Sequence, residues 1–281
     1  MANRARAEGN DGGGRLYKSV TASFMIYEQE GRDRDVHAYL AELAVAGFPN
    51  VEMRLDKFFG SKELTETTSV AMRVDGRRMP TALLEAALDD PETNNAVVMN
   101  AIGCAERATT RDLEFEGVVV VPMAGDTPRD DAGVNVAIDK LTMLAGSLRR
   151  RGLWVAVHND VTESRDGGRI LRTILDRVGD IGLSLDVEWI QRGGGDPLAF
   201  IHDYRNRLRT LHVRQAKDGV WLEDLRDGDV DYRAVEKAAR GIKSDLYVVA
   251  ELNYMEGTQK TRRPVDNLKV ARQYLRKVFV V

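Results

Sequence analysis

The segment LSLDVEWIQRGGGDPLAF, residues 183–200, carries the signal that decides the fold. Its apolar run ends at Asp186, and a polar, glycine-rich stretch then leads to Asp196 and Pro197. An aspartate before a proline is a preferred helix start, because the side chain caps the first turn and proline fits its first position. The segment therefore predicts a strand that ends in a carboxylate and is followed by a helix.

The same alternation of strand and helix runs through the chain without an intervening linker. Short β-branched runs alternate with helices that carry an apolar stripe. The stretch TALLEAAL, residues 81–88, fits either a strand or a helix. Expected strands cover residues 19–27, 51–55, 117–123, 153–160, 181–189, 208–215 and 246–254, and expected helices cover 36–47, 169–178, 232–242 and 265–279, with one more from 197 and one across 134–148. About eight such units predict a single-domain α/β protein, a (β/α)8 TIM barrel over residues 16–281.

Bulk composition limits the classes of partner. A net charge of −3 gives no basic surface for nucleic acid. The single cysteine, Cys104, excludes an internal disulfide and fits the reducing cytoplasm. No apolar run approaches the roughly 18 residues of a membrane span, and residues 1–15 have the charge and glycine content of a disordered tail. We therefore expect a cytoplasmic protein with a small-molecule partner and no nucleic-acid or membrane partner.

Four consecutive strands are expected to end in a side chain that can bind a metal or carry a proton: His158, Asp186, His212 and Glu251. In a parallel barrel all C-terminal strand ends lie on one face, where active sites form. Any one of these residues alone is more often a structural or solvated group. Four in succession, including two of the chain's four histidines, predict a shared pocket.

Several motifs of the second half occur together. They are the Asp-x-x-Trp strand end in LSLDVEW, the Gly-Asp-Pro helix start, the strand end LHVRQ, the turn GDVD and the strand LYVVAELNY. This set resembles the xylose isomerase-like TIM-barrel superfamily of sugar isomerases, epimerases, inosose dehydratases and dehydroshikimate dehydratases. The resemblance covers residues 153–281 well, and residues 18–123 only by strand rhythm and the stretch AGFPNVEMRL.

The resemblance implies a divalent metal at the barrel mouth, most often Mn or Mg, with Co or Zn as further candidates. Asp186, His212 and Glu251 match ligand positions, and His158 stands where many members have a glutamate that acts as ligand or base. Glu163 matches a glutamate that follows the His-Asn-His motif of one branch, which reads VHND in this chain. Either His158 or Glu163 completes the metal shell, and the sequence does not choose between them.

The chemistry expected of such a site is proton transfer next to a polarised carbonyl. A hard divalent ion polarises the oxygens of a polyol and acidifies the adjacent C–H bond, so that a base can remove the proton. Return of the proton to the other carbon gives an isomerase, and its return to the other face gives an epimerase. Loss of a β-hydroxyl gives a dehydratase, which is a lyase. His158 or Glu163 is the expected base, with Glu251 on the metal. Arg214 replaces the usual catalytic lysine and, because arginine stays protonated, is expected to be an electrostatic clamp.

Three further residues are candidates for binding a sugar, keto-sugar or cyclitol. Glu52 ends the second expected strand, as in the superfamily, where its carboxylate would accept substrate hydroxyls. Glu188 alternates with Asp186 along the expected strand, so it faces the pocket or the opposite side. Trp189 is of a type that stacks on sugar rings, although a tryptophan packed under a loop is about as common.

Two readings from other classes fit parts of the pattern. The replacements at Asp160, Arg214 and Gln215, together with His158, would suit a site that has lost its metal. Such a protein would be a ligand-binding or structural subunit of a larger assembly, including a subunit of a carbon–glycoside-cleaving complex. An endonuclease-type relative would need more histidine and carboxylate ligands than this chain's four histidines supply. The resemblance also implies a homodimer or homotetramer, but no segment identifies a pairing surface.

Overall fold

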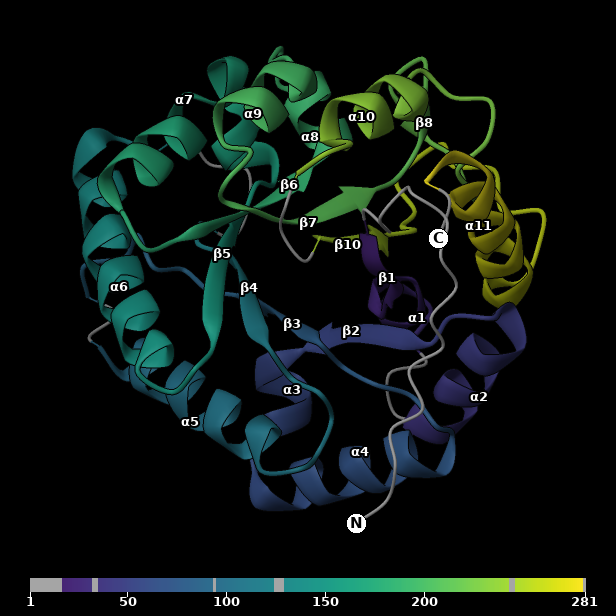
Figure 1. Ribbon diagram of the computed structural model, residues 1–281, viewed down its shortest axis with the longest axis horizontal. Coiled ribbons are helices and arrows are strands. Elements are labelled where there is room, and N and C mark those ends of the chain that lie inside the picture. Colours follow the sequence, from purple (N-terminus) through teal and green to yellow (C-terminus); the bar gives the residue numbers. More distant parts are fainter. Residues whose placement is uncertain (1–16, 32–34, 93–94, 124–128, 243–245, 280–281) are drawn as a thin grey trace.

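Eight parallel strands close into a barrel in the computed structural model of the chain (Figure 1). Neighbouring strands follow the order β1-β2-β3-β4-β5-β6-β7-β10, and β10 pairs with β1 to close the barrel. The structure describes residues 17–31, 35–92, 95–123, 129–242 and 246–279, so the tail expected at residues 1–15 lies outside the described residues. The predicted (β/α)8 TIM barrel is confirmed.

The elements alternate along the chain as the sequence pattern predicts. The barrel strands are β1 (Tyr17–Ser23), β2 (Asn50–Arg54), β3 (Thr81–Glu85), β4 (Gly117–Val121), β5 (Trp154–His158), β6 (Gly182–Asp186), β7 (Leu208–Val213) and β10 (Leu246–Ala250), and an antiparallel hairpin of β8 (Ala216–Lys217) and β9 (Val220–Trp221) follows β7. The helices are α1 (Met25–Gln29), α2 (Val36–Ala46), α3 (Leu55–Phe59), α4 (Lys62–Val74), α5 (Ala96–Thr109), α6 (Asp131–Arg149), α7 (Val161–Arg177), α8 (Val187–Arg192), α9 (Pro197–Asp203), α10 (Tyr232–Ala239) and α11 (Pro264–Val278). The longer helices surround the barrel (Figure 1).

The barrel wall is apolar because helices cover its outer face while side chains fill its interior. All five residues of β4 are buried. The first five residues of the ambiguous stretch TALLEAAL form β3, which pairs in register with β4 from Thr81, opposite Gly117, to Glu85, opposite Val121. Burial on both faces explains why this segment lacks the polar alternation of a strand with one solvated face.

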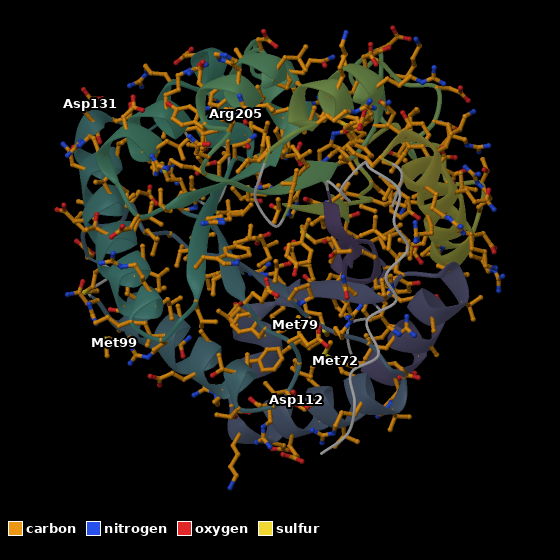
Figure 2. The ribbon with its side chains drawn as sticks, viewed as in Figure 1. Met72, Met79, Met99, Asp112, Asp131 and Arg205 are labelled. Carbon is orange, nitrogen blue, oxygen red and sulfur yellow. The ribbon has the colours of Figure 1, made fainter. Side chains whose placement is uncertain are left out.

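The helices bury an apolar stripe and leave polar side chains outside. In α6 the predicted stripe from Val134 to Leu148 is buried. Met72 and Met79 are fully buried, whereas Met99 on α5 is 61% exposed at the periphery of the molecule (Figure 2). None of the described helices is long and apolar enough to cross a membrane.

All seven expected strands end earlier than the sequence suggests. The strand expected over residues 181–189 stops at Asp186, because an oxygen of its carboxylate accepts the Trp189 N–H at 2.9 Å and caps α8. The prediction that Glu188 alternates with Asp186 along a strand is therefore wrong, since Glu188 lies on a helix. The strand expected over residues 19–27 stops at Ser23, and α1 follows it.

The pairing register aligns the C-terminal ends of β5, β6, β7 and β10 with one another. Asp186 lies opposite His212 in the β6–β7 ladder, and His158 lies opposite Ser184 in the β5–β6 ladder. His212 in turn lies opposite Val249, two residues before Glu251. Because all these strands run in the same direction, their terminal side chains meet at one face of the barrel.

Candidate active site

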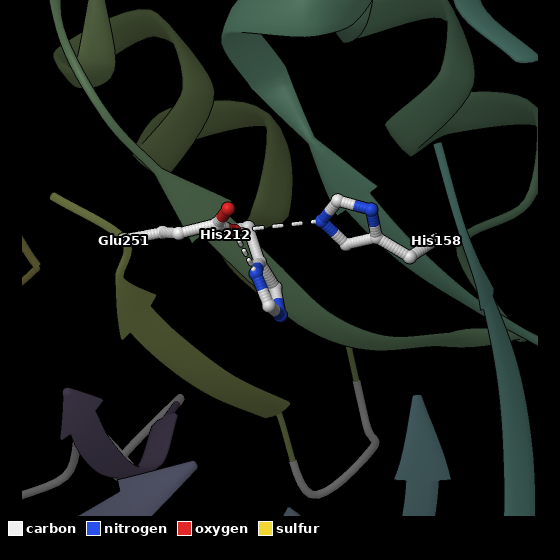
Figure 3. A group of neighbouring side chains, drawn as sticks. All are labelled: His158, His212 and Glu251. Carbon is white, nitrogen blue, oxygen red and sulfur yellow. Dashed lines mark hydrogen bonds and ion pairs between the residues drawn. The ribbon is translucent and has the colours of Figure 1, made fainter. Parts of the chain in front are cut away.

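Glu251 lies at the centre of a buried group with two histidines (Figure 3). Its Oε2 is 2.5 Å from His212 Nδ1 and 3.6 Å from His158 Nε2. One ligand atom from each of the three side chains lies within 4.8 Å of the other two. Three of the four residues predicted from the strand ends therefore come together, and their side chains are at most 4% exposed.

Asp186, the fourth strand-end residue, is committed to other partners. One carboxylate oxygen caps α8, and the other accepts hydrogen bonds from Arg214 Nε at 3.1 Å and Nη2 at 2.8 Å. Its side chain is fully buried. Asp186 is therefore next to the group of two histidines and Glu251, but an arginine occupies the oxygen that the sequence analysis assigned to a metal.

Arg214 connects Asp186 to Glu251. Its Nη2 also donates to Glu251 Oε1, and its guanidinium carbon lies 4.5 Å from the ring centre of Trp221. Burial would lower the pKa of Arg214, but Asp186 and Glu251 outweigh this effect and raise it above its ordinary value. The guanidinium is therefore a permanent positive charge in a buried site.

The carboxylates and histidines of the site influence each other's protonation. Burial would raise the pKa of Glu251, but the charge of Arg214 and the interactions with His158 and His212 hold it well below its usual range. Burial would lower the pKa of His158, yet the neighbouring Glu251, Asp186 and Asp160 carboxylates shift it upward overall. Glu251 is therefore ionised at neutral pH.

Glu52 reaches the same group from the middle of β2. Its Oε2 accepts a hydrogen bond from the Thr81 hydroxyl at 2.6 Å, and its Oε1 lies 3.4 Å from His212 Nε2. That Oε1 is buried and makes no hydrogen bond. Glu52 thus places beside His212 a carboxylate oxygen that makes no hydrogen bond.

Glu163 lies outside the group. Its two oxygens accept the backbone N–H groups of Met123, at 3.2 Å, and Asp160, at 3.0 Å. The second bond completes a capping box at the start of α7, in which Asp160 is the N-cap. Burial raises the pKa of Glu163 to about 8 despite these two bonds. The structure therefore gives both of its oxygens a role in joining the end of β5 to the segment after β4.

Glu188 and Trp189 form part of an aromatic and charged cluster on α8. Glu188 accepts hydrogen bonds from Arg192 Nε at 2.8 Å and from the Trp221 indole N–H at 3.0 Å. The rings of Trp189 and Trp221 meet edge to face, 5.4 Å apart, and both lie close to the guanidinium of Arg214. The cluster therefore contacts the site through Arg214 rather than through Glu188.

Asn159 is a positioning residue that the sequence analysis missed. Its buried amide accepts the Asp186 N–H at 2.9 Å and donates to the Asp186 carbonyl at 3.0 Å. It also donates to the Ser164 hydroxyl at 3.0 Å. These bonds fix the end of β6 against the end of β5, and the only sequence signal was its place beside His158 in VHND.

The donor set of the central group suits a divalent metal. The two ring nitrogens of His158 and Nε2 of His212 are buried and make no hydrogen bond, although buried polar atoms normally have partners. Two imidazoles and a carboxylate form a common set of ligands for Zn, and imidazole also suits other transition metals better than Mg. His158, His212 and Glu251 therefore fit a metal by chemistry and by proximity.

Solved structures share this fold over almost the whole chain. A sugar phosphate isomerase/epimerase from Parabacteroides distasonis ATCC 8503 superposes with a TM-score of 0.71 at 19% identity, covering 93% of this chain and 95% of that one. D-psicose 3-epimerase from Clostridium cellulolyticum H10, solved with D-tagatose, gives 0.71 at 12% identity over 93% and 99% of the two chains. A xylose isomerase domain protein from Alicyclobacillus acidocaldarius subsp. acidocaldarius gives 0.66 at 14% identity over 87% and 93%.

Sequence comparison is less informative than structure comparison for this chain. No protein-family model matches it, and no curated protein matches it in sequence. The similar structures are sugar phosphate isomerase/epimerase and xylose isomerase-like proteins, in agreement with the superfamily that the sequence motifs resemble. At these identities the likeness establishes the barrel fold.

Proposed function

We propose that this protein is a divalent-metal-dependent isomerase or epimerase of a sugar, keto-sugar or cyclitol. The observation that carries the proposal is the buried group of His158, His212 and Glu251, in which three of the four histidine ring nitrogens make no hydrogen bond. The shared fold with structures named as sugar isomerases and epimerases supports the same class. A dehydratase on the same scaffold would differ in its product, so product analysis separates the two activities.

We assign the metal to His158, His212 and Glu251. When bound there, the ion would polarise a carbonyl and an adjacent hydroxyl of the substrate. Two imidazoles in the set favour Mn, Zn or Co over Mg, because Mg prefers oxygen ligands. Asp186 contributes by holding Arg214, whose permanent charge faces the site.

Proton transfer requires a group that the metal and the backbone leave free. Both oxygens of Glu163 accept backbone N–H groups, and His158 is assigned to the metal. Glu52 Oε1 makes no hydrogen bond, and its strand β2 lies across the barrel from β6. We therefore assign the movement of the proton to Glu52 Oε1, with His158 as the alternative base.

The test combines metal content with exchange of substrate hydrogen. Wild-type protein purified without chelator is expected to hold about one metal per chain by mass spectrometry and to incorporate solvent deuterium into a keto-sugar. His212→Gln should lose the metal, whereas Glu52→Gln should keep it and lose deuterium uptake. Loss of deuterium uptake in His158→Gln with the metal retained would transfer the role of base to His158. Absence of metal in wild-type protein, even after addition of Mn²⁺, would overturn the proposal.

A second candidate is a metal-free ligand-binding subunit. The specific observation in its favour is that Arg214 already forms ion pairs with both Asp186 and Glu251. This candidate predicts no stoichiometric metal, no deuterium uptake and a larger partner on size-exclusion chromatography. A homodimer or homotetramer, as the resemblance implies, remains a prediction that the same chromatography measures.

A further inference from the structure

Arg214 lies between two carboxylates that the sequence analysis assigned to the metal. Its Nε and Nη2 donate to one oxygen of Asp186, and Nη2 also donates to Glu251 Oε1. The three side chains are at most 4% exposed. One buried positive charge therefore pairs with two buried negative charges. Water has little access to these groups and cannot screen their charges effectively.

We propose that Arg214 competes with a divalent cation for Asp186 and Glu251, so that a cation gains full access to these carboxylates only when the guanidinium moves off them. The inference rests on the proposed function, because it concerns the same metal. A cation on Glu251 would lie close to a guanidinium of like charge, and this repulsion is strong where the effective dielectric is low. Arg214 therefore sets the metal affinity of the site.

The contacts of Arg214 show which part of it can move. Its backbone N–H donates to the Tyr232 hydroxyl at 3.0 Å, and that hydroxyl donates to its backbone carbonyl. Its guanidinium lies 4.5 Å from the Trp221 ring centre and 5.6 Å from that of Trp189. The backbone is thus fixed, so displacement from the carboxylates is confined to the side chain, whose guanidinium already lies near the aromatic rings.

Arg192 provides a matched control from the same cluster. It lies 5.9 Å from the ring centre of Trp221 and 5.4 Å from that of Trp189, and it pairs with Glu188. Its guanidinium bonds to Glu188 and to the Gly219 carbonyl, not to either carboxylate of the proposed competition. Replacement of Arg192 therefore removes one positive charge from the cluster and leaves the contacts of Arg214 with Asp186 and Glu251 in place.

The experiment is isothermal titration of Mn²⁺ into metal-stripped, full-length protein. Arg214→Gln is expected to bind Mn²⁺ about tenfold more tightly than wild type, or better, because a unit charge in contact with two carboxylates is removed. Arg192→Gln is expected to stay within about threefold of wild type, because its charge is farther away and partly screened. Arg214→Gln without metal should also melt at a lower temperature than wild type, and Mn²⁺ should restore it.

The outcomes separate this inference from the proposed function. Unchanged or weaker Mn²⁺ binding by Arg214→Gln, with binding by wild type, would overturn the competition and leave the metal-dependent function intact. Binding by Arg214→Gln but not by wild type would support the competition and overturn metal dependence of the natural protein. Absence of binding by both would overturn both ideas.

A second variant covers the case in which Arg214→Gln does not fold. Arg214→Lys keeps a buried positive charge, but its single nitrogen cannot reproduce the additional hydrogen bond that Arg214 Nε donates to Asp186. Its Mn²⁺ affinity should lie between those of wild type and Arg214→Gln. A lysine variant that binds Mn²⁺ no more tightly than wild type would overturn the competition.

Discussion

Arg214 donates two hydrogen bonds to a single oxygen of Asp186, at 3.1 and 2.8 Å, while the Trp189 N–H donates to the other oxygen. Both side chains of the ion pair are buried. The pair joins the end of β6 to the residue that follows β7. Removal of one partner would leave the other as an uncompensated buried charge, which is far more costly than loss of an exposed pair.

The first prediction concerns this pair. Asp186→Asn keeps an oxygen for the Trp189 N–H but removes the charge opposite Arg214, so the free energy of unfolding should fall by about 3 kcal/mol. The exposed pair of Arg172 and Asp203 supplies the control, and Asp203→Asn should lower the free energy of unfolding much less, because solvent screens this pair. Urea denaturation at pH 7 measures both values. Equal losses in the two variants would contradict a special role for the buried pair.

The second prediction concerns stabilisation by metal. Free Mn²⁺ at about 100 times its dissociation constant should raise the free energy of unfolding by about 2.7 kcal/mol, because the ion binds the folded site. His212→Gln should abolish this increase, and a chelator should reverse it. His202 is the matched control, since its side chain is 83% exposed and is not part of the buried group. If His202→Gln also removed the effect, the increase would not come from the proposed centre. Calorimetric melting curves with and without Mn²⁺ provide the measurement.

The third prediction follows from Glu163, whose pKa burial raises to about 8 from an ordinary value of 4.5. The folded protein therefore retains this proton at pH values where the unfolded chain has released it. Its stabilising effect is complete below about pH 4.5 and is lost as the pH rises towards 8. The free energy of unfolding should thus decline across this window in the wild type, and less steeply in Glu163→Gln.

Glu163→Gln should also lose about 1 kcal/mol at pH 5, because glutamine has one acceptor oxygen for two backbone N–H groups. Denaturation curves between pH 5 and 8 test both effects. Glu256→Gln, at an exposed position, should follow the wild-type pH dependence. Parallel curves for wild type and Glu163→Gln would refute the assignment.

The fourth prediction concerns the turn GDVD after the hairpin. A Cβ on Gly228 would lie 2.2 Å from side-chain carbons of Gln215. The Gln215 amide cannot easily give way, because it bonds to the Val230 carbonyl at 3.1 Å and N–H at 3.0 Å. Gly228→Ala should therefore cost about 1 to 3 kcal/mol. Gly179→Ala, with no atom within 4 Å of the added Cβ, should be close to neutral. Thermal unfolding compares the two, and a neutral Gly228→Ala would show that the turn can move.

The sequence by itself determined the barrel and the positions of the strand-end residues. Apolar runs, helical stripes and caps such as Asp196 with Pro197 are local signals, and local backbone and burial preferences produce them. Parallel strands then bring His158, His212 and Glu251 to one face, whatever the details of packing. The strand that ends at Asp186 is shorter than predicted, because the Asp186 side chain caps a helix that starts within the same apolar segment.

Only the tertiary structure decided which partner each of these side chains has. Asp186 pairs with Arg214, and Glu163 bonds to Met123, although each pair is far apart in sequence. No periodicity encodes such pairings, because they depend on the direction of each side chain and on the register between neighbouring strands. The sequence therefore specified which groups reach the barrel mouth, and the packed barrel decided that an arginine lies between two of its carboxylates.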